Sequence, residues 1–175
     1  MVSSKTSKMP TPSLSPLEFR KALGHFTTGV TVVTVERQPG KIQGMTANSF
    51  TSVSLDPMLI LICVDKKAKI LPLLEKKKVF GVSVLKQSQE AISEYFARGK
   101  HSAEAEERLS IQYAWSPSGV PVLEDALLQL GCKVISAHVA GDHTIFVAEV
   151  QDAEIHDGQP LLYFRGGYRK IAASH

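Results

Sequence analysis

The sequence has few cysteines and no long apolar run. Only two of its 175 residues are cysteines, Cys63 and Cys132, and both lie in apolar stretches without the spacing of a metal-ligand or redox pair. No apolar run approaches the roughly 18 residues that a membrane helix needs. We therefore expect reduced core thiols, no disulfide framework and a cytoplasmic location.

The chain also lacks a large excess of charge of either sign, since 20 basic and 17 acidic residues give a formal net charge of +3. The basic residues cluster in residues 65–78 (DKKAKILPLLEKKK), without the interleaved aromatic residues of a nucleic-acid-binding surface. Neither of the two glycine-rich loops that hold nucleotides on helix N-termini, G-x-G-x-x-G and G-x-x-x-x-G-K-[ST], occurs in the chain. These absences argue against general nucleic-acid binding and mean that any nucleotide is held in another way.

The chain length and composition indicate one globular domain. Hydrophobic residues make up 43% of the chain and charged residues 21%, as in ordinary globular proteins. Residues 1–14 are rich in Ser, Thr and Pro and have no apolar signal region, so we expect a flexible leader followed by one domain over residues 15–175.

Short β-branched segments separated by turn residues dominate the chain. Residues 30–36, 44–55, 58–64, 79–85, 126–140, 143–155 and 160–166 read as strands. Residues 68–77, broken near Pro72, and residues 88–98 read as helices, and residues 99–110 as an exposed connection. The seven residues 58–64 are all apolar, which is typical of a central strand covered on both faces. The pattern predicts a mainly β fold: an antiparallel barrel with helices packed outside it.

A further helix is predicted over residues 16–26. Ser15, Pro16 and Glu18 form a capping-box signature with proline in the first turn. Its apolar side chains are expected to face the core: Leu17, Leu23 and Phe26.

Residues 44–57 (GMTANSFTSVSLDP) place small and hydroxyl-bearing side chains in the body of a strand. Without bulky side chains, backbone groups can approach the edge of a flat polar heterocycle while hydroxyls reach a sugar or phosphate. The alternative is a half-exposed strand whose polar residues face water. The residues concerned are Thr46, Ala47, Asn48, Ser49, Thr51, Ser52 and Ser54.

Five segments occur in the order seen in the short-chain flavin reductase family, which the chain resembles: FTTGVTVVTV, GMTANSFTSVSLDP, LILICVD, GDHTIFVAEV and PLLYFRGGYR. The resemblance implies a six-stranded FMN-binding split barrel, a homodimer, and NAD(P)H-dependent reduction of FMN or FAD. Hydride then passes from the nicotinamide to the flavin, and the reduced flavin supplies a partner monooxygenase.

The resemblance also implies site residues. His143 is expected beside the flavin face, where it positions the nicotinamide. The basic stretch after Cys63 is expected to run towards the flavin phosphate. The chain departs from the family at some of these lysines, where Ser or Thr is common, and at Ser83, where a strand Asn is common. The implied cofactor-binding residues are Met45, Thr46, Ala47, Asn48, Ser49, Ser54, Cys63, Val64, Asp65, Lys66, Lys69, Phe96, Arg98 and Tyr168.

Other interpretations stay open at this point. Phe96 fits a core position in a helical stripe, and Arg165 or Arg169 could pair with acidic residues at a subunit contact. The same barrel could serve a non-enzymatic flavin- or tetrapyrrole-binding or electron-transfer protein. A hydrolase using Cys63 or a serine lacks a G-x-S-x-G elbow, and His138 and His143 lack metal-ligand spacing, so no metal site is expected.

Overall fold

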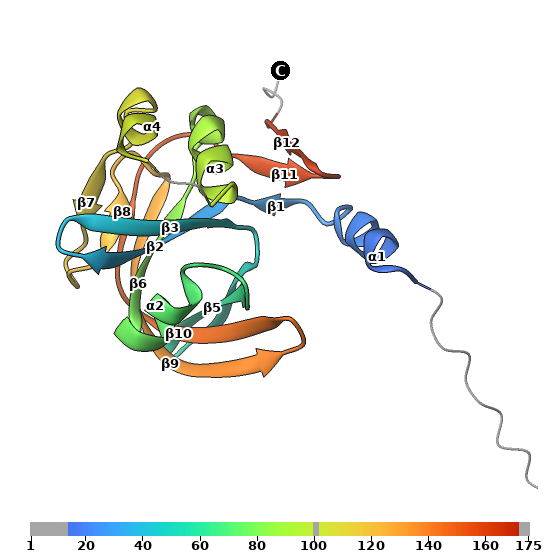
Figure 1. Cartoon of the computed structure of the whole chain (residues 1–175), viewed down its shortest axis with the longest axis horizontal. Coiled ribbons are helices and arrows are strands. Elements are labelled where there is room, and N and C mark those ends of the chain that lie inside the picture. The colour runs from blue at the N-terminus through green and yellow to red at the C-terminus, as the bar shows by residue number, and fades with distance from the viewer. Residues whose placement is uncertain (1–13, 100–101, 172–175) are drawn as a thin grey trace, which may run out of the picture.

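Seven antiparallel strands form the main sheet, in the order β3-β2-β6-β9-β10-β5-β4 (Figure 1). The computed structural model describes residues 14–99 and 102–171, so the predicted leader lies outside the described residues except for Leu14. The strands are β2 (Thr31–Gln38), β3 (Lys41–Ala47), β4 (Phe50–Leu55), β5 (Met58–Asp65), β6 (Val79–Val84), β9 (Leu128–Ala140) and β10 (His143–Ile155).

The two edge strands of this sheet are consecutive in the chain. Only residues 48 and 49 separate β3 from β4, so the chain itself joins the two edges and the sheet curls into a barrel. Because β3 and β4 act as one bent strand, the barrel has six strands. The predicted mainly β, six-stranded split barrel is confirmed.

Alternating burial along β5 shows how the barrel encloses its core. Ile60, Ile62 and Val64 point inward and are buried, whereas the outward Leu61 and Cys63 are only half-buried. β5 lies between β10 and β4, so its central position is confirmed, but its outer face is not fully covered within one chain. The same core is completed by Phe80 from β6, Phe146 from β10 and Leu74 from the helix that follows β5 in the chain.

Short helices cover the barrel: α2 (Leu71–Lys77), the 3-10 turn η1 (Gln87–Gln89), α3 (Glu90–Ala97) and α4 (Ala103–Arg108). Pro72 lies in the first turn of α2, where its missing N–H costs no hydrogen bond, so the expected break is absent from this helix. The stretch predicted as a connection contains α4, because the Ser102 side chain accepts a hydrogen bond from the Ala105 N–H and caps a helix with no apolar stripe.

Helix α3 packs closely on β3. Phe96 is buried there, and a Cβ on Gly44 would lie 2.5 Å from its ring, so only glycine at this position allows the ring to lie against the strand. A separate two-stranded sheet of β7 (Tyr113–Trp115) and β8 (Pro121–Leu123) packs against β2 and β6.

Both ends of the described chain form an extension beside the barrel (Figure 1). Its sheet contains β1 (Thr28–Gly29), β11 (Leu162–Phe164) and β12 (Gly167–Arg169), and α1 (Pro16–Leu23) precedes it. The Arg165 N–H donates to the Gly24 carbonyl (2.7 Å), which ties α1 to the turn between β11 and β12.

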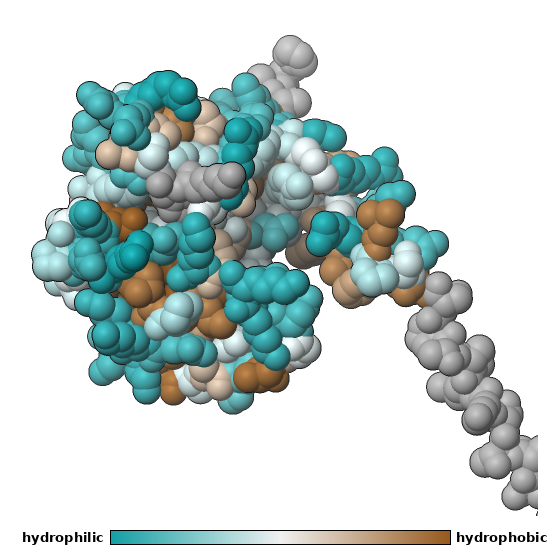
Figure 2. Space-filling view, viewed as in Figure 1, coloured by the Kyte–Doolittle hydropathy of each residue, from teal (hydrophilic) through white to brown (hydrophobic). Residues whose placement is uncertain are grey.

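The orientation predicted for α1 is wrong. The Ser15–Glu18 capping box forms as expected, but the helix ends at Leu23 and none of its residues is buried. Leu17 is 61% exposed and Phe26 77% exposed, because α1 projects from the barrel instead of packing on it (Figure 2).

No helix in the described parts of the chain is long and apolar enough to cross a membrane.

Candidate functional site

A pocket of about 230 Å³ opens where β3 bends into β4. Four parts of the chain form its wall: the residue between β1 and β2, the end of β3 with Asn48, one face of α3, and the hairpin of β11 and β12. Its lining residues are Val30, Thr46, Ala47, Asn48, Ser93, Ala97, Tyr163 and Tyr168.

Small side chains and hydrogen bonds shape the β3 side of this pocket. Ala47 presents only a methyl group, and its carbonyl accepts a hydrogen bond from the buried Thr31 hydroxyl (2.7 Å). The Thr46 hydroxyl donates to the Ser93 carbonyl (2.6 Å) and so fixes β3 against α3. The strand therefore presents backbone and small side chains at the pocket wall.

Strand pairing connects this wall to two other predicted segments. The Ser49 hydroxyl donates to the Cys63 carbonyl (2.8 Å), and the Cys63 N–H donates to the Ser49 carbonyl (3.3 Å). Two residues further along β5, Asp65 lies opposite His143, the first residue of β10. Residues 46–49, 63–66 and 143 thus lie along one end of the barrel.

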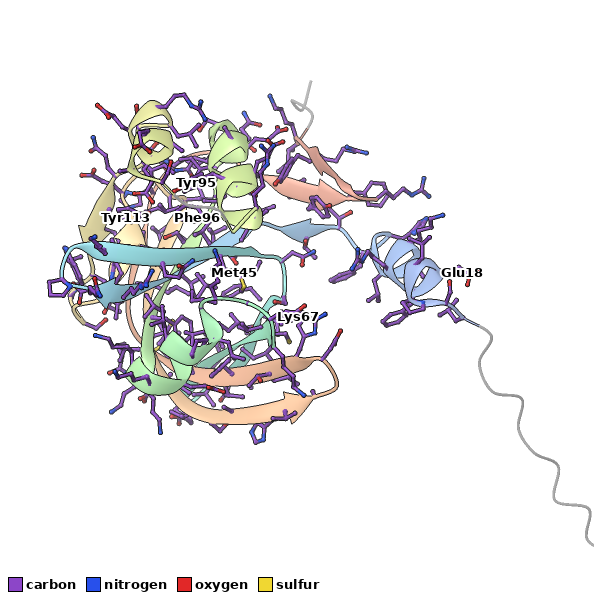
Figure 3. The ribbon with its side chains drawn as sticks, in the orientation of Figure 1. Glu18, Met45, Lys67, Tyr95, Phe96 and Tyr113 are labelled. Carbon is purple, nitrogen blue, oxygen red and sulfur yellow. The ribbon has the colours of Figure 1, made fainter. Side chains whose placement is uncertain are left out.

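Loop contacts engage two of the three lysines that follow β5. The Lys66 ammonium donates to the Gly141 carbonyl (2.7 Å) and the Lys69 ammonium donates to the Gly99 carbonyl (2.8 Å). Asp65 caps the turn by accepting a hydrogen bond from the Lys67 N–H (2.7 Å). The Lys67 ammonium has no partner among residues 14–99 and 102–171, and Figure 3 shows this residue at the end of the barrel where the β9–β10 hairpin turns.

His143 is paired with its neighbour in the chain. Its Nδ1 lies 2.7 Å from Oδ1 of Asp142, and its side chain is 42% exposed. The hydrogen bond from His143 lowers the pKa of Asp142, and the charges of His143 and Lys66 act in the same direction. The ring therefore has a hydrogen-bond partner at the barrel end and stays accessible.

Residues 23–172 match the family model of the flavin reductase-like domain. The chain belongs to this family. An NADH-dependent flavin reductase from Rhodococcus sp is 40% identical, over 91% of this chain and 89% of that protein. The reductase component of 4-hydroxyphenylacetate 3-monooxygenase from Thermus thermophilus is 39% identical, over 87% of this chain and 95% of its own.

Solved structures of flavin reductases superpose on the chain. Flavin reductase PheA2 matches with a TM-score of 0.83 at 41% identity, over 91% of this chain and 99% of its own. The NADH:FAD oxidoreductase SgcE6 of Streptomyces globisporus, solved in complex with NAD and FAD fragments, matches with a TM-score of 0.82 at 37% identity, over 95% of this chain and 98% of its own. The family resemblance read from the five sequence segments is confirmed.

The flavin reductase-like fold brings some of the predicted site residues to the pocket and leaves others away from it. Thr46, Ala47, Asn48 and Tyr168 line it. The adjoining barrel end carries Ser49, Cys63, Asp65, Lys66 and His143. The Lys69 ammonium instead bonds to the Gly99 carbonyl, just after α3.

Five predicted residues lie elsewhere. Phe96 and Val64 are buried, and Met45 packs against the barrel core. For Phe96 this is the core position that the sequence analysis gave as the alternative. Arg98 pairs with Glu94 on the surface of α3 (3.0 Å), and Ser54 sits near the β4–β5 turn. None of these five side chains lines the pocket.

Four residues of the pocket were missed from the sequence: Val30, Ser93, Ala97 and Tyr163. Ser93 and Ala97 are four residues apart, so they share one face of α3, but a serine and an alanine at this spacing carry no chemical signature. Tyr163 lies in the PLLYFRGGYR segment and pairs directly with Tyr168 across the hairpin, which places both side chains on one face.

The environment of Cys63 argues against a hydrolase that uses this residue as its nucleophile. Burial raises the pKa of the Cys63 thiol, so this cysteine stays protonated near neutral pH and is a poor nucleophile. In the described residues no group of three or more His, Cys, Asp or Glu side chains could hold a metal ion.

A second cavity of about 330 Å³ lies beside α3, and none of the predicted site residues lines it.

Proposed function

We propose that the protein is an NADH-dependent flavin reductase that uses FMN or FAD. The observation that carries the proposal is the 40% identity, over 91% of the chain, to a protein of that activity. The pocket at the bend between β3 and β4 supports it, because it combines a flat, small-residue wall with polar groups from two other elements.

The residues of the pocket fit a flavin ring. Ala47 and Ala97 leave room on two sides, and Tyr163 and Tyr168 provide an aromatic wall. The Asn48 side chain is exposed and has no hydrogen-bond partner in the part of the chain that the structure describes, so its amide is available to a polar ring edge. A pocket of about 230 Å³ suits one ring system, with the remainder of the cofactor outside it.

Each part of the site then has a task. The flavin, when bound, supplies a hydride acceptor for the dihydronicotinamide. Backbone groups of residues 46–48 orient the ring, and Lys67 attracts the phosphate. His143 positions the nicotinamide, because its ring is held by Asp142 yet remains accessible. We expect no side chain to transfer an obligatory proton.

The reduced flavin is proposed to serve a monooxygenase. A relative that covers nearly the same length is the reductase component of 4-hydroxyphenylacetate 3-monooxygenase. The pocket of this chain is open on the protein surface and is large enough for one ring system, which suits a flavin that is released as a substrate. A cytoplasmic location, where NADH is available, fits this activity.

The protein is further proposed to be a homodimer. The apolar side chains of α1 are exposed, and its anchors to the β11–β12 turn hold them away from the barrel. His25 adds an edge-to-face contact with Phe164 at 6.3 Å, so the extension is fixed in place. An exposed apolar surface on a fixed element is typical of an interface, and a second copy of the chain would cover it.

A steady-state assay tests the activity. The purified protein should oxidise NADH only when FMN or FAD is added, with a rate that saturates in both substrates. Binding of flavin without NADH oxidation would instead support a non-enzymatic flavin-binding or electron-transfer protein. Absence of both flavin binding and NADH oxidation would refute the proposed function.

A further inference from the structure

We propose that Tyr168 donates a hydrogen bond to the polar edge of the flavin ring and that Ser93 positions it, an inference that rests on the proposed function. The two hydroxyl oxygens lie 2.7 Å apart, and both residues line the pocket. The sequence did not identify Ser93, and it placed Tyr168 at the cofactor without assigning it a role.

Ser93 is the point where three elements meet. Its residue is fully buried, its carbonyl accepts the Thr46 hydroxyl from β3, and its hydroxyl pairs with Tyr168 from β12. The edge-to-face contact of the Tyr168 ring with Tyr163, at 5.5 Å and 70°, adds a second constraint. The Tyr168 hydroxyl is therefore held at a defined place in the pocket wall.

The hydrogen-bond inventory of this pair leaves one donor unused. Each hydroxyl carries one hydrogen, and a single hydrogen bond between them uses only one of the two. Neither hydroxyl has another partner in residues 14–99 and 102–171. A spare O–H therefore remains at the pocket wall.

Burial decides which residue presents that hydrogen. Ser93 is inaccessible, whereas Tyr168 is half-buried and reaches the pocket. The arrangement that leaves the spare hydrogen accessible has Ser93 donating to Tyr168 and Tyr168 donating outward. An oxidised flavin ring offers acceptor oxygen and nitrogen atoms along its polar edge, which match one fixed donor.

Flavin titrations of three variants test this assignment. The probes are FMN and lumiflavin, which has the same ring without the ribityl phosphate, and the readout is quenching of flavin fluorescence. Tyr168→Phe should raise the Kd of both probes by about tenfold, and Ser93→Ala by about threefold. Because Ser93 acts through Tyr168, the double variant should match Tyr168→Phe. Tyr113→Phe is the control, since it removes a tyrosine hydroxyl bonded to Glu106 outside this pocket.

Three results would overturn the inference. An unchanged Kd for both probes in Tyr168→Phe, with a lowered melting temperature, would make the hydroxyl pair a structural link only. A loss for FMN but not lumiflavin would place the contact on the flavin tail. An unchanged flavin Kd with a raised KM for NADH would assign the hydroxyl to the nicotinamide. In each case wild-type reductase activity would leave the proposed function standing, whereas a wild type without flavin binding or NADH oxidation would refute that function itself.

Discussion

His143 lies directly opposite Asp65 across the antiparallel pairing of β10 with β5. The same barrel end carries the hydrogen bond between the Lys66 N–H and the Asp142 carbonyl (3.0 Å), so the β9–β10 turn is fastened to the end of β5. This arrangement brings the histidine and the basic loop after β5 to one side of the proposed flavin site, although about 80 residues separate them in the chain.

Replacing His143 with Ala should slow flavin reduction without abolishing it. Hydride transfer depends on stacking and orientation more than on acid catalysis, so loss of a positioning ring should lower kcat/KM for NADH by about tenfold, about 1.4 kcal/mol. The Kd for flavin should change little. Stopped-flow reduction at varied NADH measures both: unchanged NADH kinetics would leave His143 a turn residue, and complete loss of reduction with flavin bound would assign it a chemical role.

Bulky residues on the pocket wall should displace the flavin. Ala97 is exposed on α3 and lines the pocket, so Ala97→Leu should raise the flavin Kd by about tenfold, about 1.4 kcal/mol, with little effect on stability. Ala47→Phe should weaken binding as well, but Ala47 is also part of the barrel core, so overpacking should lower stability by about 1–3 kcal/mol. Ala91→Leu, exposed on the same helix and outside the pocket lining, is the control. Equal flavin affinities in all three variants would show that the flavin ring does not bind in this pocket.

The loop lysines should differ in their contribution to phosphate binding. The ammonium groups of Lys66 and Lys69 already bond to loop carbonyls, so Lys67→Ala should weaken FMN binding most, by about fivefold, about 1 kcal/mol. Riboflavin, which lacks the phosphate, should bind wild type and Lys67→Ala equally. Isothermal titration with both flavins separates the effects, and a larger loss in Lys66→Ala or Lys69→Ala would return the phosphate to the residues first predicted.

Polar substitutions on the α1 extension should dissociate the proposed dimer. Leu17→Ser with Phe26→Ser removes two exposed apolar side chains that contribute little to the fold of one chain, so the protein should stay folded and become monomeric. Trp115→Ser is the matched control, because this exposed aromatic residue lies on β7, on the far side of the barrel (Figure 1). Light scattering over a range of concentrations gives the mass; a monomeric wild type with full activity would contradict the proposed assembly.

The sequence predicted the barrel because its strands are marked locally. β-branched runs, the turn around Gly40 (φ 71°) and the turn at Gly141 (φ 60°) each specify a strand or its end without help from distant residues. The wall of residues 46–48 was predictable for a related reason: small residues in a strand indicate close approach of the backbone to something else.

Features that depend on contacts between distant segments were not predictable. An amphipathic pattern in residues 16–26 indicates that one face of the helix is apolar but does not say whether that face packs on the barrel of the same chain. Likewise, Ser93 is an ordinary helix residue until β3 and β12 meet it, and Phe96 is assigned to the core only by its contact with Gly44.

A cluster beneath α3 and α4 should make the protein sensitive to alkaline pH. The Tyr95 and Tyr113 hydroxyls both donate to one oxygen of Glu106, at 3.0 and 3.3 Å (Figure 3 labels both tyrosines). Burial, with the neighbouring Glu106, raises the pKa of Tyr95 to about 12 and raises the pKa of Tyr113 as well.

The direction of the pH effect follows from proton binding. A tyrosine in the unfolded chain titrates near pH 10, so above that pH the folded state holds more protons than the unfolded state. The free energy of unfolding should therefore fall from about pH 10 towards pH 12, by up to about 1.4 kcal/mol per pH unit for each tyrosine. Cys132, whose pKa burial raises to about 12, adds a loss that begins near pH 8.5.

Urea unfolding at a series of pH values measures this dependence, and Tyr→Phe variants isolate the tyrosines from the cysteine. Tyr95→Phe with Tyr113→Phe should lower stability at neutral pH by about 1–2 kcal/mol through the lost hydrogen bonds to Glu106, yet flatten the decline above pH 10. Cys132→Ser should remove only the part of the decline that starts at lower pH. If the double tyrosine variant loses stability above pH 10 as steeply as wild type, the two hydroxyls ionise as readily in the folded protein as in the unfolded chain, and the alkaline sensitivity has its origin elsewhere.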